Sequence, residues 1–131
     1  MIVCVCGMIG AGKSEYARRS GKTVSDSDAI GSKKEQLDFT FKNHKKEGEI
    51  YHITCYPTQE EQEKFAEHDV KYVWINTTIA QCRINILHRG RARDIKNMQE
   101  VLRKNKMIQR KYINSCIKFE VVDIFGSSER W

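Results

Sequence analysis

Hydrophobic residues gather in five short runs along the 131-residue chain. Each run is continuous and rich in β-branched, aromatic or cysteine side chains, a composition typical of strands that are covered on both faces. The runs predict strands at residues 2–6, 23–25, 50–55, 72–76 and 119–124.

Polar segments with helix signals separate these runs. The first predicted helix covers about residues 12–19, with Gly21 just past its end, and a second covers residues 35–46 and ends before Gly48. Strands that alternate with helices imply a parallel sheet with right-handed crossovers and helices on both faces.

Two later segments carry clearer helix starts. Thr58 with Glu61, and Thr78 with Gln81, have the spacing of a capping box, in which two side chains satisfy N–H groups at the start of a helix. The helix after Thr78 is expected to stop at Gly90.

The last helix is predicted to begin at Asp94, whose side chain can cap it. Its expected buried side is formed by apolar residues at helical spacing, namely Ile95, Met98, Val101, Leu102, Ile108, Tyr112 and Cys116. Together, the strands and helices predict one α/β domain over residues 1–131, built on a doubly wound, mainly parallel five-stranded sheet.

The composition is that of a soluble globular protein, with 40% hydrophobic and 31% charged residues. No apolar run approaches the roughly 18 residues that a membrane-spanning helix needs. The N-terminal run lacks a basic lead-in and is too short for a signal peptide. We therefore expect a cytoplasmic protein that has no membrane partner.

Five cysteines are scattered along the chain. Cys4 and Cys6 point to the same side of a strand, but no second close pair completes a four-ligand zinc site. His52 and Cys55, three residues apart on a strand, would face opposite sides. Reduced thiols without a structural metal are the expectation.

The formal net charge of +6 is unevenly placed. Ten Lys or Arg residues lie between Arg83 and Lys111, against only Asp94 and Glu100. Such a block indicates either a solvated helix face or a phosphate-rich partner, a nucleotide or a nucleic acid.

Residues 7–14 match the phosphate-loop (Walker A) motif G-x-x-x-x-G-K-[ST] in full, and they follow a predicted strand and precede a predicted helix. Their sequence is Gly7-Met8-Ile9-Gly10-Ala11-Gly12-Lys13-Ser14. Glycines let backbone N–H groups approach phosphate oxygens, Lys13 supplies a cation for the β- and γ-phosphates, and Ser14 offers a hydroxyl to Mg²⁺. This loop predicts binding of ATP with Mg²⁺.

A second polar cluster, Ser25-Asp26-Ser27-Asp28, directly follows the second predicted strand. The carboxyl ends of strands in a doubly wound sheet gather on the edge that holds the phosphate loop. One carboxylate can then orient water on Mg²⁺ while the other accepts a proton from an attacking hydroxyl. In the alternative interpretation, Asp26 or Asp28 only caps a turn or helix.

A third cluster joins Arg83 with residues 88–94, where Arg89, Arg91 and Arg93 alternate around Gly90. The planar guanidinium suits the charge that spreads over phosphoryl oxygens. A short, basic, glycine-containing connection is typical of a mobile lid over ATP, although a solvated loop between helices has the same composition. Residues 88–94 are called the lid segment below.

These three clusters, in this order, resemble the small P-loop kinases, a group with a nucleoside monophosphate kinase-like P-loop fold that includes shikimate and gluconate kinases. The resemblance is strongest to the kinase domain of phage-type polynucleotide 5′-kinases, through the phosphate loop, Asp28, Phe65-Ala66 and Arg89-Gly90 followed by a basic helix, over roughly residues 1–112. It implies that Asp28 is the general base, that Asp26 holds Mg²⁺ through water, and that one or more of Arg89, Arg91 and Arg93 is the lid cation.

The third predicted strand departs from this pattern. Many members of the group carry an acidic residue at the end of that strand, whereas here it closes as Ile53-Thr54-Cys55-Tyr56-Pro57. Either Asp26 takes over the metal role, or the acceptor chemistry is altered or activity is lost.

The sequence thus predicts an ATP- and Mg²⁺-dependent phosphotransferase, with Lys13, Asp28, Arg89 and Arg91 as catalytic residues. The favoured acceptor is a 5′-hydroxyl of a nucleic acid or a nucleotide. The alternatives are a nucleoside or nucleoside-monophosphate kinase and, from another class, a nucleotide-binding module or slow ATPase.

Overall fold

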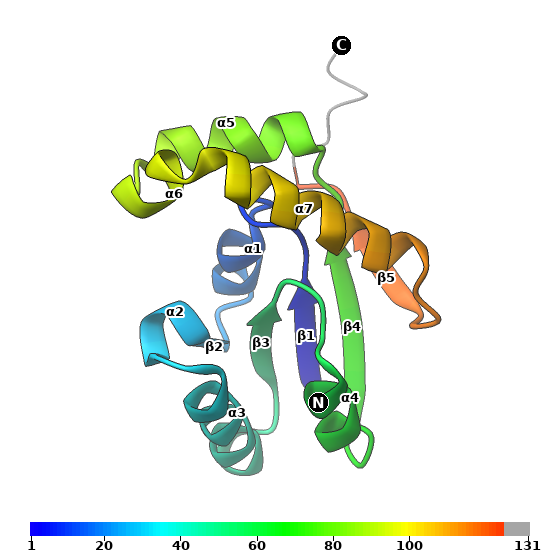
Figure 1. Cartoon of the computed structure of the whole chain (residues 1–131). Helices are drawn as coiled ribbons and strands as arrows, with labels where there is room; N and C mark the ends of the chain where they lie inside the picture. The colour runs from blue at the N-terminus through cyan, green and yellow to red at the C-terminus, as the bar shows by residue number, and fades with distance from the viewer. Residues whose placement is uncertain (125–131) are drawn as a thin grey trace.

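Five parallel strands form one sheet in the computed structural model, which describes residues 1–124 (Figure 1). The order across the sheet is β2-β3-β1-β4-β5. The strands are β1 (Ile2–Cys6), β2 (Thr23–Asp26), β3 (Ile50–Thr54), β4 (Val70–Ile75) and β5 (Phe119–Val122). All neighbouring pairs are parallel, so the predicted doubly wound, five-stranded sheet is confirmed.

The central strand explains why the first hydrophobic run is continuous. β1 lies between β3 and β4, and all five of its residues are buried. The edge strand β5 has no fully buried residue. The apolar content of each run therefore follows the position of its strand in the sheet.

Seven helices connect the strands. They are α1 (Lys13–Arg19), α2 (Ser27–Ile30), α3 (Lys33–Glu47), α4 (Gln59–Phe65), α5 (Ile79–Arg89), α6 (Ala92–Lys96) and α7 (Met98–Ile113). The short helix α2 was not predicted, because its four residues are too few to show a helical period. No described helix is long and apolar enough to cross a membrane.

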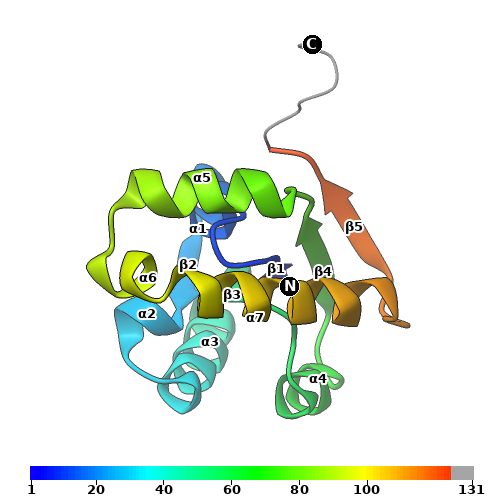
Figure 2. The same cartoon turned by 45° about the horizontal axis from the view of Figure 1, so that its top comes forward.

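Helices cover both faces of the sheet. On one face, Trp74 of β4 stacks on Tyr112 of α7 with ring centroids 4.0 Å apart, and His52 of β3 meets Phe65 of α4 edge-on. On the other face, Tyr51 of β3 contacts the ring of Tyr16 from α1. α5 and α7 lie beside each other along the carboxyl edge of the strands and are joined through α6 (Figure 2).

The two predicted capping boxes differ in outcome. At α4, the Thr58 hydroxyl accepts the Glu61 N–H and the Glu61 carboxylate accepts the Thr58 N–H, so the box is complete. At α5, Thr78 accepts the N–H of Gln81, but the Gln81 side chain donates to Asn85 instead of returning to the cap. The second box is therefore only half formed.

The prediction that Asp94 begins the last helix is wrong. Asp94 lies inside α6 with 7% of its surface exposed, and α7 starts separately after Asn97. The Asp94 carboxylate pairs with the guanidinium groups of Arg89 and Arg93, which are stronger partners than backbone N–H groups. Ile95 is 42% exposed and Cys116 lies beyond the end of α7, so neither belongs to the predicted buried side.

Candidate active site

The predicted phosphate loop leaves the carboxyl end of β1 and turns into α1 (Figure 1). Gly10 and Gly12 have φ angles of 84° and 101°, in the left-handed region that favours glycine. A Cβ atom on Gly10 would also lie 2.7 Å from the Cys82 carbonyl oxygen and 2.9 Å from Ile86. The motif leaves position 10 open, but glycine is required there both by the backbone conformation and by the close approach of α5.

Lys13 lies across the loop. Its ammonium group donates to the carbonyl oxygens of Gly7 at 2.7 Å and Met8 at 2.9 Å, and to the Cys55 sulfur at 3.4 Å. Within the described chain, no side chain caps the start of α1, where the N-cap residue is Gly12. Both the cation and the free N–H groups of the first helical turn are thus positioned for an anion.

Ser14 and Asp26 come together at the entrance to α1. The Ser14 hydroxyl lies 3.4 Å from Asp26 Oδ2, although twelve positions separate the two residues in the chain. The other oxygen, Asp26 Oδ1, accepts the N–H of Asp28 and caps α2. Asp26 therefore caps a helix, as the alternative interpretation of the sequence expected, and it also lies beside the serine of the phosphate loop, while its predicted role toward Mg²⁺ stays a prediction.

Asp28 lies in α2 with 60% of its side chain exposed, and its carboxylate pairs with Arg91 at 3.3 Å. This ion pair joins the second and third polar clusters of the sequence, which are 63 positions apart. Arg89 and Arg93 instead pair with Asp94, at 3.2 and 3.6 Å. The structure thus brings Arg91 to the predicted general base and ties the other two arginines to each other through Asp94.

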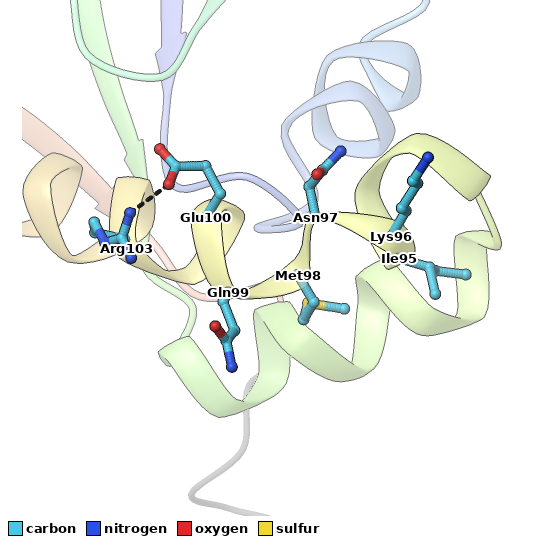
Figure 3. A pocket seen from close by; sticks show the side chains of 7 residues that line it. All are labelled: Ile95, Lys96, Asn97, Met98, Gln99, Glu100 and Arg103. Atoms are coloured by element: carbon cyan, nitrogen blue, oxygen red, sulfur yellow. Dashed lines mark hydrogen bonds and ion pairs between the residues drawn. The ribbon is translucent and has the colours of Figure 1, made fainter.

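A shallow cavity of about 500 Å³ lies beside this corner, around the junction of α6 and α7 (Figure 3). Its lining residues are Ile95, Lys96, Asn97, Met98, Gln99, Glu100 and Arg103. None of them belongs to the phosphate loop, to Asp26 or to Asp28. The cavity is therefore a separate hollow next to the lid segment and not the predicted nucleotide site.

A buried polar network was missed by the sequence analysis. Glu61 is fully buried, and its carboxylate accepts from His52 Nε2, from Lys33 Nζ at 3.1 Å and from the Thr54 hydroxyl at 3.2 Å. His52 Nδ1 lies 2.7 Å from the Thr40 hydroxyl. The signal available in the sequence was a histidine inside an otherwise apolar strand, which needs polar partners when it is buried.

The network holds Glu61 in its charged form. Burial raises the pKa of Glu61, but the hydrogen bonds from His52 and the Thr58 amide, together with the charge of Lys33, outweigh it and bring the pKa to about 2. Burial lowers the pKa of His52, only partly offset by Glu61. A neutral His52 that donates to an ionised Glu61 fits both shifts, and the network then fastens α3 and α4 to the end of β3.

Comparisons with known proteins identify the fold. No family model and no curated protein matches the chain. Among solved structures, the deoxyadenosine kinase from M. mycoides with bound dATP matches with a TM-score of 0.56 and 16% identity, over 94% of this chain and 91% of that one. The same enzyme with the products dCMP and dCDP matches with a TM-score of 0.50 and 16% identity, over 94% and 90% of the two chains. The fold is that of a P-loop kinase.

At 16% identity, the likeness shows the fold alone, and the strand order agrees with it. The solved structures belong to a nucleoside kinase, the class that the sequence analysis gave as an alternative to the polynucleotide 5′-kinases.

Proposed function

We propose that this protein is an ATP-dependent nucleoside kinase. The observation that carries the proposal is the phosphate loop at the carboxyl edge of the sheet, with the Lys13 ammonium group folded over the loop and Ser14 placed against Asp26. The likeness to deoxyadenosine kinase over 94% of the chain supports a nucleoside as the acceptor.

Residues 7–14 would hold the triphosphate. The Lys13 ammonium group would leave the carbonyl oxygens of the loop and donate to phosphate oxygens instead. Ser14 and Asp26 are a hydroxyl and a carboxylate, the kinds of oxygen ligand that Mg²⁺ prefers, and they would hold the ion directly or through water. Mg²⁺ would neutralise charge on the phosphates and orient them for in-line attack.

Asp28 would accept the proton of the attacking hydroxyl. Its carboxylate is exposed and its Oδ2 pairs with Arg91, so opening of this ion pair would leave both oxygens free for an acceptor. Arg91 would then be free to contact the phosphoryl group, where its charge helps the transition state more than the ground state. One rearrangement would thus prepare the base and deliver the cation, which is the role proposed for the lid segment.

The test is a phosphate-transfer screen with labelled ATP. The acceptors are ribo- and deoxynucleosides, nucleoside monophosphates, small alcohols and oligonucleotides with a 5′-hydroxyl. Transfer to nucleosides is the expected result. Calorimetry that detects no ATP–Mg²⁺ binding by the intact protein would refute the proposal. ATP binding without acceptor-stimulated turnover would identify a nucleotide-binding module instead.

A second acceptor class, the 5′-hydroxyl of nucleic acid, is favoured by one observation. The basic residues of α7, namely Arg103, Lys104, Lys106, Arg110 and Lys111, are all exposed. Phosphate contacts along a strand make binding fall steeply with salt, whereas a nucleoside has no such phosphates. The acceptor KM against ionic strength, for the wild type and a Lys104→Ala/Lys106→Ala variant, therefore separates the two classes. A flat response would reject nucleic acid.

A further inference from the structure

Three consecutive carbonyl groups of the phosphate loop are bound by side chains from the second half of the chain. The carbonyl oxygen of Ile9 accepts from Asn105 Nδ2 at 3.0 Å, and that of Gly10 accepts from Asn85 Nδ2 at 2.8 Å. The carbonyl oxygen of Ala11 accepts from the Thr77 hydroxyl at 2.8 Å. These donors come from α7, α5 and the turn after β4, so three separate elements fix one short stretch of backbone.

Fixing a carbonyl also fixes the next N–H group. In a planar trans peptide, the C=O of one residue and the N–H of the following residue point in opposite directions. The Ile9 carbonyl points toward α7, so the Gly10 N–H points away from α7. In the same way, the Ala11 carbonyl points toward Thr77, so the Gly12 N–H points away from Thr77. Within residues 1–124, neither of these two N–H groups has a hydrogen-bond acceptor. The loop is thus held with donors free for an anion.

Asn105 makes the most specific of these contacts. Its Oδ1 accepts the Ile9 N–H at 2.7 Å while its Nδ2 donates to the Ile9 carbonyl, and the side chain is fully buried. Both halves of the amide are used on one residue, 96 positions away in the chain. Leucine has a similar size but neither group, and aspartate keeps the acceptor but loses the donor.

We propose that Asn105 is a positioning residue that holds the phosphate loop in its anion-binding geometry. Asn105 belongs to α7, the helix that follows the lid segment and α6, so nucleotide affinity depends on how α7 is docked. This inference rests on the proposed function for its nucleotide but concerns a residue that the motif does not contain. The competing explanation is that Asn105 only anchors α7 and contributes to stability.

The experiment compares Asn105→Leu and Asn105→Asp with the control Val101→Ala. Val101 is buried one turn earlier in α7, is 7% exposed, and has no polar side-chain group that could bind the loop. The first measurement is hydrogen–deuterium exchange of the peptide that covers residues 7–14, without nucleotide. The second is the Kd of ATP–Mg²⁺ by calorimetry, at a temperature where every variant is folded.

The expected result is faster exchange in residues 7–14 and an ATP affinity lower by about 10–100-fold in both Asn105 variants, the scale of one or two lost buried hydrogen bonds. Val101→Ala should lower the Tm but leave the exchange and the Kd close to wild type. Wild-type exchange and affinity in folded Asn105→Leu would overturn the inference and leave the proposed function intact.

Failure of the wild type to bind ATP would instead refute the proposed function. The exchange measurement, which needs no nucleotide, would still test the contact. If Asn105→Leu does not fold, the nearly isosteric Asn105→Asp decides the outcome by the same two measurements.

Discussion

The phosphate loop and the lid segment both contain a glycine turn next to a helix, yet they are held in different ways, and most of the lid segment belongs to the end of α5 and the start of α6. The loop is fixed by hydrogen bonds to its own backbone, from Lys13, Asn85, Asn105 and Thr77. The lid segment is held by side-chain ion pairs, of Arg91 with the exposed Asp28 and of Arg89 and Arg93 with the buried Asp94. Backbone contacts define a single geometry, whereas exposed ion pairs are weak and exchange partners easily. The proposed lid would therefore be the more easily rearranged of the two segments.

Replacement of Lys13 tests the phosphate loop and has the largest expected effect on activity. Lys13→Ala should abolish measurable phosphate transfer, because the only cation inside the loop is removed from the triphosphate. The fold should persist, since the core of the sheet is untouched. Turnover assays with circular dichroism check both statements, and Lys22→Ala, an exposed lysine before β2, is the control. Activity within tenfold of the wild type would show that residues 7–14 do not bind the transferred phosphate.

Replacement of the lid arginines asks whether the ion pairs differ in role. Arg91→Ala should slow turnover on the order of 10³–10⁵-fold with little change in the Kd of ATP, because the cation acts mainly in the transition state. Arg89→Ala should also lower the Tm, since it leaves the buried Asp94 with Arg93 as its remaining partner. Equal rates in wild type and both variants would mean that residues 88–94 have no part in phosphate transfer.

Replacement of Asp28, the partner of Arg91, tests the predicted general base. Asp28→Asn should slow turnover by roughly 10²–10⁴-fold while the affinity for ATP is nearly kept, because the amide cannot accept the proton of the attacking hydroxyl. Rate and affinity are measured in the same sample, with Asp38→Asn on the exposed side of α3 as the control. Full activity in Asp28→Asn would mean that residues 25–28 only cap a helix and have no catalytic role.

The pH dependence of stability has the smallest expected effect and concerns the network below the site. The pKa of Glu61 is about 2 in the folded protein, against 4.5 for an unperturbed glutamate. A depressed pKa contributes stability above the unfolded value, and that stability is lost as the pH falls from about 5 toward 2. The difference corresponds to about 3 kcal/mol.

Urea unfolding at a series of pH values measures this loss. The wild type and the control Glu60→Gln, whose side chain is an exposed neighbour on α4, should both lose stability over this range. Glu61→Gln should be less stable than the wild type at neutral pH and should show a flatter dependence. Parallel curves of unfolding free energy against pH for all three proteins would contradict the ionised state assigned to Glu61.

The sequence was sufficient for features that depend on local pattern. The strands were predictable because buried parallel strands require continuous apolar runs, and residues 7–14 because their chemistry requires fixed residue types. The helix α2, the inward position of Asp94 and the network around Glu61 were not predictable. Each depends on side chains that meet only after folding, such as Asp28 with Arg91. Asn105 looked like one more polar residue of a basic helix, since no local pattern shows that its amide fits a loop 96 positions away.

The stack of Trp74 on Tyr112 gives this protein a built-in optical probe. Trp74 is 2% exposed and lies parallel to a ring of α7, the helix that also carries Asn105. Indole emission shifts to longer wavelength when the ring meets water, so the spectrum of Trp74 reports whether α7 is seated on the sheet. The second tryptophan, Trp131, lies outside the described residues and can be replaced by phenylalanine to isolate the signal. Any movement of α7 on addition of ATP can then be followed in real time without a label.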